Sequence, residues 1–117
     1  MVERFEDLIV WQKAHKLTLE IYRITRDYPA EERFGLVPQM RRAAVSIPAN
    51  IAEGFKKRGK RYKANFYNIA QASGEEVKYY LILSRDLGYA KDTATLEGLI
   101  DEIGKMLHAL IKTCLEQ

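Results

Sequence analysis

The stretch that decides the fold is Ser46-Ile47-Pro48-Ala49-Asn50-Ile51-Ala52-Glu53-Gly54. Its apolar residues recur at steps of three and four, and this spacing continues on both sides, which indicates one face of an α-helix. Proline lacks a backbone N–H and its ring crowds the preceding turn, so Pro48 must either kink one helix or separate two. The unbroken spacing favours one helix, from about Phe34 to Phe55, kinked at Pro48. Ser46 or Asn50 is expected to bond the backbone groups that the proline frees.

Three further stretches carry the same spacing and predict three more helices. They run from about Phe5 or Leu8 to Thr25, from about Arg61 to Asp86 or Leu87, and from about Thr93 or Thr95 to Leu115. No stretch alternates apolar and polar residues for long enough to require a strand. Because short connections between long helices favour antiparallel neighbours, the sequence predicts an all-α fold: a single up-and-down antiparallel four-helix bundle domain over residues 1–117.

Local features follow from residue type and spacing. Asp7 is expected to cap the first helix, and Gly88 to end the third. Tyr79 and Tyr80 point about 100° apart on a helix, so one of them is expected to face outward. The inward face of the third helix is predicted to comprise Phe66, Ile69, Ala70, Ser73, Val77, Tyr80, Leu81 and Ser84.

Composition narrows the class of protein. The chain has 117 residues, of which 47% are hydrophobic and 30% charged, and this suits one globular domain. Cys114 is the only cysteine, so neither an intrachain disulfide nor a cysteine metal cluster is possible, and a reducing, cytoplasmic compartment is the simplest interpretation. The N-terminal segment does not look like a signal peptide. No apolar run approaches the ~18 residues that span a bilayer, so no membrane association is expected.

One short segment makes the protein basic. The formal net charge is +3, but without the six basic residues between positions 56 and 63 it would be −3. These six residues are Lys56, Lys57, Arg58, Lys60, Arg61 and Lys63. Gly54 and Gly59 bracket the run and are expected to mark a turn. No acidic residue lies between Gly54 and Gly74 to offset the charge.

Two interpretations of the basic run are open. A cluster of Lys and Arg can neutralise nucleic-acid phosphates, and Tyr62, Phe66 and Tyr67 can stack on bases if they are exposed. Alternatively, the run is a solvated corner between two helices. Arg41 and Arg42 extend the patch only if they share its face.

Patterns for catalysis or cofactors are weak. The run from Gly54 to Lys60 has the spacing of a phosphate-binding loop, but Arg61 stands where Ser or Thr should bind magnesium, and a helix precedes it where that loop needs a strand. His15 and His108 lack the glutamate three residues earlier that di-iron bundles use. Glu53, Glu75 and Glu76 are candidates for a carboxylate site, although ion pairs with nearby Lys or Arg also account for them. Cys114 lies on an apolar stripe, which favours packing over catalysis. The sequence therefore predicts no catalytic residue, no metal, no cofactor and no small-molecule substrate.

The stretch quoted first resembles a family signature. Residues 46–54 are similar to the signature of the bacterial four-helix bundle proteins named after 23S rRNA intervening sequences. The resemblance extends to residues 5–14, 41–45, 66–76 and Gly88-Tyr89, and so covers nearly the whole chain. It is specific because a proline inside a helix is rare by chance.

The resemblance implies an up-and-down bundle that assembles into a ring of five subunits. It also implies similarity to the accessory proteins of diversity-generating retroelements, which share the fold and bind nucleic acid through a basic surface. The residues implied to line that surface are Lys56, Lys57, Arg58, Lys60, Arg61 and Lys63. The residues implied to be architectural are Ser46, Pro48, Asn50, Glu53 and Gly54, which shape the kink and its capping interactions. The family label describes where some members are encoded and does not establish ribosome binding.

The leading hypothesis is a non-enzymatic, homo-oligomeric helical module, pentameric if the resemblance holds, that binds RNA or DNA through its basic patch. The alternative is a protein-binding or structural scaffold in which the basic run pairs with an acidic partner. An enzyme with a carboxylate site is the third class.

Overall fold

The computed structural model describes residues 2–116, and these form helices and short 3-10 turns with no β-strand among them. The α-helices are α1 (Ile9–Thr25), α2 (Leu36–Lys56), α3 (Lys60–Asp86) and α4 (Ala94–Glu116), and the 3-10 turns are η1 (Phe5–Asp7) and η2 (Ala30–Glu32). The predicted all-α fold is confirmed, and each helix begins and ends within a few residues of its predicted position. The predicted cap is wrong: Asp7 lies in η1, and Leu8 precedes α1 without a side-chain cap.

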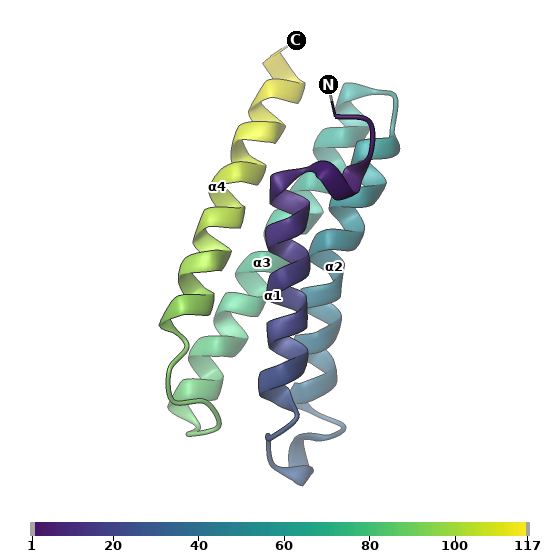
Figure 1. Ribbon diagram of the computed structural model, residues 1–117. Helices are drawn as coiled ribbons and strands as arrows, with labels where there is room; N and C mark the ends of the chain where they lie inside the picture. The colour runs from purple at the N-terminus through teal and green to yellow at the C-terminus, as the bar shows by residue number, and fades with distance from the viewer. Residues whose placement is uncertain (1, 117) are drawn as a thin grey trace.

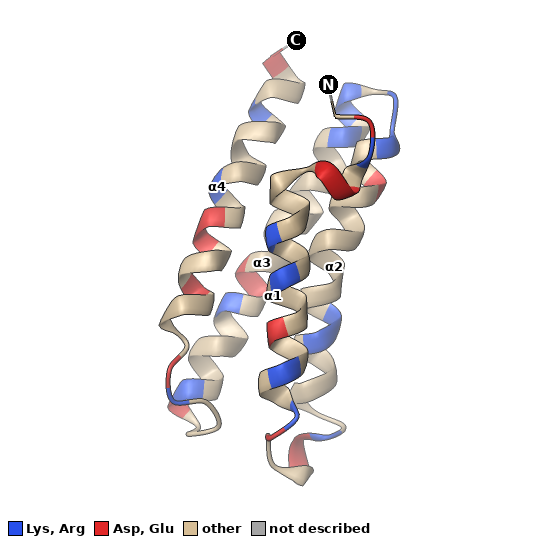
Figure 2. Ribbon diagram, in the orientation of Figure 1, with Lys and Arg blue, Asp and Glu red and all other residues tan. Residues whose placement is uncertain are grey.

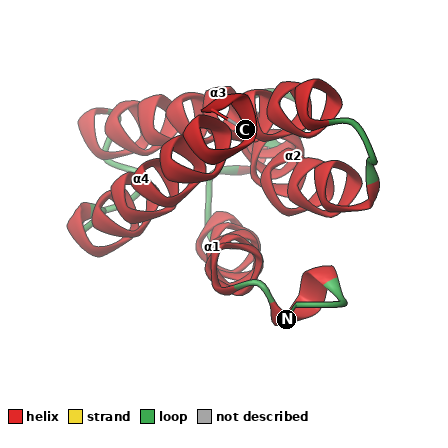
Figure 3. Ribbon diagram, turned by 90° about the horizontal axis from the view of Figure 1, so that it is seen from above, coloured by secondary structure: helices red, strands yellow, loops and turns green. Residues whose placement is uncertain are grey.

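The four helices run alternately up and down (Figure 1). α1 contacts α2 and α4, and α3 contacts the same two helices. From above, α1 and α3 therefore lie on opposite sides of the bundle (Figure 3). Both chain termini and the α2–α3 turn lie at one end, and the α1–α2 and α3–α4 turns lie at the other (Figure 1). This is the antiparallel bundle that the sequence predicts, in a body measuring 47 × 22 × 20 Å.

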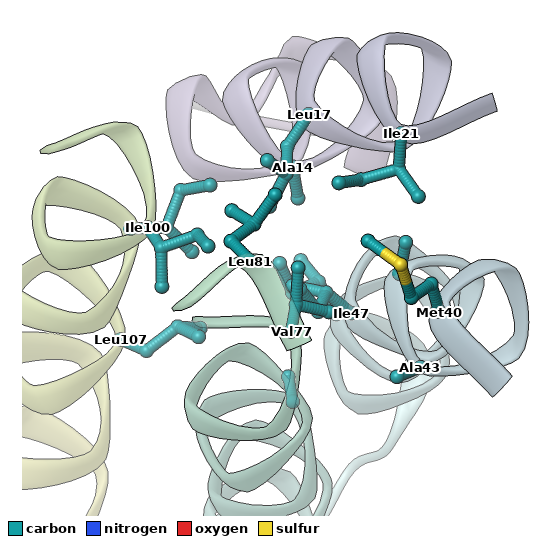
Figure 4. Packing of buried hydrophobic residues seen from close by; sticks show 14 of the residues in the cluster. Ala14, Leu17, Ile21, Met40, Ala43, Ile47, Val77, Leu81, Ile100 and Leu107 are labelled. Atoms are coloured by element: carbon teal, nitrogen blue, oxygen red, sulfur yellow. The ribbon is translucent and has the colours of Figure 1, made fainter. Parts of the chain in front are cut away.

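The apolar stripes of the four helices meet in one core (Figure 4). Leu17 and Ile21 of α1 face Met40 and Ile47 of α2, while α4 approaches from the other side. The fully buried large side chains are Leu17, Ile21, Met40, Ile47, Ile51, Val77, Leu81, Ile103 and Leu107. Each such side chain stabilises the fold by roughly 1.5–3 kcal/mol through its removal from water. Burial of the periodic residues is therefore what holds the helices together.

α2 continues through Pro48 without a break, so the two-helix alternative is wrong. The missing N–H leaves the carbonyl of Ala44, four residues earlier, without its helical donor. A residue from another helix replaces that donor: the buried hydroxyl of Thr18 in α1 lies 3.1 Å from the Ala44 oxygen, and it also lies 2.9 Å from the Ala14 oxygen. Asn50 donates to the Ser46 carbonyl at 2.8 Å, as the sequence suggests. The carbonyl that the proline frees, that of Ala44, instead accepts a hydrogen bond from Thr18 of α1.

The buried face of α3 is turned by one residue from its predicted position at the α2–α3 end. Ile69, expected inside, is 48% exposed, whereas Tyr67 is only 4% exposed. Gly54 of α2 accounts for the burial of Tyr67, because a Cβ at Gly54 would lie 2.8 Å from Cε1 of Tyr67. The glycine leaves room for the tyrosine ring against the backbone of α2. Gly54 therefore lies inside a helix, and the turn that it was expected to mark comes later, at residues 57–59.

The end of α3 follows its prediction. Gly88 has a φ of +81°, and the N–H groups of Gly88 and Tyr89 bond the carbonyls of Arg85 and Ser84 in a Schellman motif. The Tyr89 hydroxyl then donates to Glu32 at 2.9 Å, while the other oxygen of Glu32 accepts the N–H of Leu36, the first residue of α2. Because Glu32 lies between α1 and α2 and Tyr89 lies between α3 and α4, their hydrogen bond links the two connections at this end of the bundle.

Candidate nucleic-acid interface

The six cations predicted as a patch surround the α2–α3 turn at the end of the bundle that carries both termini (Figure 2). We call this group the basic corner: Lys56, Lys57, Arg58, Lys60, Arg61 and Lys63. All of them except Lys63 are exposed. Their clustering follows from local sequence, since α2 ends at Lys56 and α3 begins at Lys60. The fold therefore turns this charge toward solvent.

The ion pairing of the basic corner differs from that of other cations on the molecule. Lys13 and Lys78 each bind a carboxylate of α4 at 2.8 Å, and Arg85 binds Glu97 at 3.0 Å. Within residues 2–116, no carboxylate forms an ion pair with Lys56, Lys57, Arg58 or Arg61. An exposed cation without an internal partner keeps its charge available for a ligand.

Lys63 has a different environment from its neighbours. Its ammonium donates to the carbonyl oxygens of Phe55, at 2.7 Å, and Gly54, at 3.3 Å, and lies 5.4 Å from the centre of the Phe55 ring. These carbonyls belong to the last turn of α2, where a positive charge is favourable. Lys63 therefore caps α2, and its ammonium is bonded to backbone carbonyls of the protein.

An acidic neighbour comes from the N-terminal segment. Glu6 of η1 lies beside α2, where the hydrogen bond from Arg4 lowers the pKa of the Glu6 carboxyl and the charge of Lys56 lowers it further. Figure 2 shows this red segment next to the blue turn. Glu6 is distant from the basic run in the sequence and comes beside it only through the fold, so the sequence did not indicate it. Glu6 narrows the available positive face on the side of Lys56.

The three aromatic residues that follow the basic run have three different environments. Tyr67 is in the core, and burial raises the pKa of its hydroxyl to about 12. Phe66 is half-buried, with the Lys57 ammonium 5.2 Å from the centre of its ring. Tyr62 is 66% exposed. Of the three, Tyr62 is the one whose ring is largely open to solvent.

Arg41 and Arg42 do not extend the basic corner. Arg41 lies over the Tyr22 ring at 4.6 Å and donates to Thr25 and to the Tyr22 carbonyl at the end of α1. Arg42 is exposed and lines a cavity of about 520 Å³ between α2 and α3. Both lie about 21 Å or more along α2 from Lys56, at 1.5 Å per residue.

The five residues expected to be architectural lie along α2. The Ser46 hydroxyl accepts from Asn50 and from Ser73 of α3, both at 2.9 Å, so it links the two helices. Pro48 and Gly54 are buried, and their neighbours are described above. Glu53 is exposed and forms no hydrogen bond or ion pair with a residue in the range 2–116, so no capping interaction involves it.

The residues of the other candidate sites lie apart from the basic corner or in a different structural context. Across residues 2–116, no three His, Cys, Asp or Glu side chains are grouped to hold a metal ion, so Glu53, Glu75 and Glu76 do not form a metal site. The phosphate-loop spacing lies between two helices and not after a strand. The His15 ring stacks on the Trp11 ring, with 5.0 Å between the ring centres, and His108 is exposed. None of the described helices is both long and apolar enough to cross a bilayer.

Taken together, the fold and this surface define a small up-and-down four-helix bundle with a basic end. The family model for 23S rRNA-intervening sequence proteins matches residues 6–109. The chain belongs to the 23S rRNA-intervening sequence protein family.

A solved structure supports the same assignment. It is a protein of unknown function from the S23 ribosomal protein family of Bacteroides thetaiotaomicron, 26% identical to this chain, with a TM-score of 0.81. The match covers 89% of this chain and 96% of that one. No curated protein matches the sequence. The comparisons therefore support the family and the fold.

Proposed function

We propose that this protein is a non-enzymatic, homo-oligomeric module of the cytoplasm that binds RNA or DNA by contacting phosphates with its basic corner. The observation that carries the proposal is the set of exposed cations around one helix turn, of which Lys56, Lys57, Arg58 and Arg61 form no ion pair with a described carboxylate. Phosphates are regularly spaced anions, and each one that a cation neutralises releases a condensed counterion. Binding through phosphate contacts alone is therefore independent of base sequence.

The charge count sets the expected salt dependence. Four phosphate contacts per subunit give a slope of log affinity against log salt of about −3 to −4. Several copies that hold their corners on one assembly would steepen the slope, because more phosphates are neutralised together.

Self-association is supported by apolar side chains that the single chain leaves in solvent. Ile9, Leu19 and Leu115 are each more than half exposed, and Phe34 is 90% exposed. Ile9 also lines an open groove of about 290 Å³ between α1 and α4, whose walls are mostly apolar. Exposed apolar groups of this kind are typical of surfaces that another subunit covers. The number five rests on the family resemblance alone, and light scattering on the pure protein tests it.

The same exposed apolar residues also favour the second candidate function, a protein-binding or structural scaffold. In that case the basic corner pairs with an acidic protein surface. A pull-down with and without nuclease separates the two candidates, because a nucleic-acid partner is lost on nuclease treatment and an acidic protein is retained.

The direct test is a titration with duplex DNA and with structured RNA at two salt concentrations. The test variant changes Lys56, Lys57, Arg58, Lys60 and Arg61 to Glu, and leaves Lys63 in place because it caps α2. The matched control makes the same charge change at five exposed cations elsewhere, namely Lys16, Arg26, Arg33, Lys91 and Lys105.

We expect the test variant to lose binding while its helical circular dichroism is unchanged, and the control to lose much less. Equal losses from the two variants would show that net charge, and not the basic corner, governs binding. If the test variant binds as tightly as the unchanged protein, the basic corner is not the surface that binds nucleic acid.

A further inference from the structure

Tyr62 lies in the first turn of α3, among residues of the basic corner. Its neighbours in the chain are Arg61 and Lys63, and Lys60 begins the helix. The side chain is 66% exposed, although a tyrosine elsewhere on the same helix, Tyr67, is in the core. Within residues 2–116 its hydroxyl forms no hydrogen bond, so no polar contact accounts for its position.

One edge of the Tyr62 ring lies close to Gly59. A Cβ built on Gly59 would lie 2.8 Å from Cδ2, 3.5 Å from Cε2 and 3.9 Å from Cγ of that ring. Gly59 has φ −81° and ψ 136°, which any residue adopts, so the backbone conformation does not require glycine there. The room that the absent side chain leaves is what lets the ring lie close. The Cδ2 edge of the ring therefore lies close to the turn, and the side chain is largely in solvent.

A solvent-exposed aromatic ring among cations is a platform on which a nucleotide base can stack. Stacking accepts every base because each has a π-face, and the surrounding cations bind the flanking phosphates. Bases inside a duplex are already stacked on both sides and do not present a free face. The ring therefore adds binding energy only for unpaired nucleotides.

We propose that the basic corner prefers single-stranded or unpaired nucleic acid, with one base stacked on Tyr62. This inference rests on the proposed function and specifies its ligand. Lys57 is held over the Phe66 ring, and Arg58 and Arg61 are exposed on the same turn, so phosphates on either side of the stacked base have cations within the same surface.

The test compares two probes at one salt concentration: a single-stranded oligothymidylate of about 16 nucleotides and a random-sequence duplex of the same length. Tyr62→Ala should weaken binding of the single strand about 5- to 100-fold and change binding of the duplex less than about twofold. Tyr62→Phe keeps the ring and should bind both probes as the unchanged protein does. Tyr79→Ala is the matched control, since Tyr79 is 57% exposed on the same helix but far from the turn.

Gly59→Ala provides a second variant that leaves Tyr62 in place. The added Cβ displaces the ring from its position close to the turn, and we expect the affinity for the single strand to fall while the affinity for the duplex is kept. Equal effects of Tyr62→Ala on the two probes, or no effect on either, would overturn the stacking inference and leave phosphate binding intact. Binding that survives charge reversal of the corner would instead overturn the proposed function, so the two failures are distinguishable.

Discussion

Thr18→Val probes how α2 tolerates a proline inside its span. The change keeps the shape of the side chain and removes the hydroxyl that lies 3.1 Å from the Ala44 carbonyl. The Ala14 carbonyl, which the same hydroxyl also contacts, keeps its ordinary helical donor, the N–H of residue 18. Thr18 is only 8% exposed, so water does not readily replace the lost donor. The substitution thus leaves one buried carbonyl without a partner.

The expected cost comes from that single group. A buried acceptor left without a partner costs about 1–3 kcal/mol. In a Pro48→Ala background the new N–H bonds the Ala44 carbonyl, and the cost of Thr18→Val should fall below about 0.5 kcal/mol, because the group is satisfied again. The two substitutions should therefore show a coupling of about 1–2 kcal/mol.

Urea unfolding followed by circular dichroism, at one protein concentration, measures the four free energies of this cycle. Thr113→Val is the matched control, because its hydroxyl bonds the Ala109 carbonyl at 2.9 Å on an exposed face of α4 with no proline nearby. We expect it to change stability by less than about 0.5 kcal/mol. If Thr18→Val is equally costly with and without Pro48, the proposed relation between α1 and the proline is wrong.

Three further predictions concern stability and use the same measurement. Gly54→Ala should destabilise by about 1–3 kcal/mol, since its Cβ would meet the Tyr67 ring at 2.8 Å, whereas Gly98→Ala, with open space around it, should stabilise by up to about 1 kcal/mol. Tyr67 has a pKa of about 12, above its unfolded value of roughly 10, so its contribution is complete below pH ~10 and is lost as pH rises toward 12. From pH ~10 to pH ~12, the free energy of unfolding of Tyr67→Phe should therefore fall by about 2 kcal/mol less than that of the unchanged protein. Equal falls in the two proteins would contradict the raised pKa of Tyr67. Tyr89→Phe removes the bond to Glu32 and should cost about 1 kcal/mol, whereas no change would show that the two turns are held by packing alone.

The helices and their order were predictable because apolar periodicity is a local property of the chain. Residues at steps of three and four fall on one face whatever the neighbours are, and burying that face requires a bundle. The stop at Gly88 was predictable for the same reason, since a left-handed residue at a helix end favours glycine on its own account. The inward face of α3 near residues 66–69 was not predictable. Two faces of α3 offset by one residue both carry apolar side chains in this range. Which of them is buried depends on Gly54, which lies on another helix.

The candidate interface was predictable in its position and not in its detail. Six charges in eight residues are evident in the chain, and a turn between two helices exposes them. The inward contact of Lys63 and the approach of Glu6 depend on tertiary structure, as does the donor that Thr18 supplies to Ala44. The burial of Tyr67 likewise depends on Gly54, which lies on another helix, whereas Tyr62 is exposed beside Gly59.

The N- and C-terminal segments lie at the same end of the bundle as the α2–α3 turn (Figure 1), and this has a practical consequence for experiments on the molecule. An affinity tag or a fluorescent fusion at either terminus would be tethered at the same end of the bundle as the surface whose binding is to be measured, and a basic tag would add its own attraction for polyanions. Labels are better attached at the α3–α4 connection, near Lys91 and Asp92, which are exposed at the opposite end of a body 47 Å long. A reporter attached there leaves the ligand-facing end unobstructed.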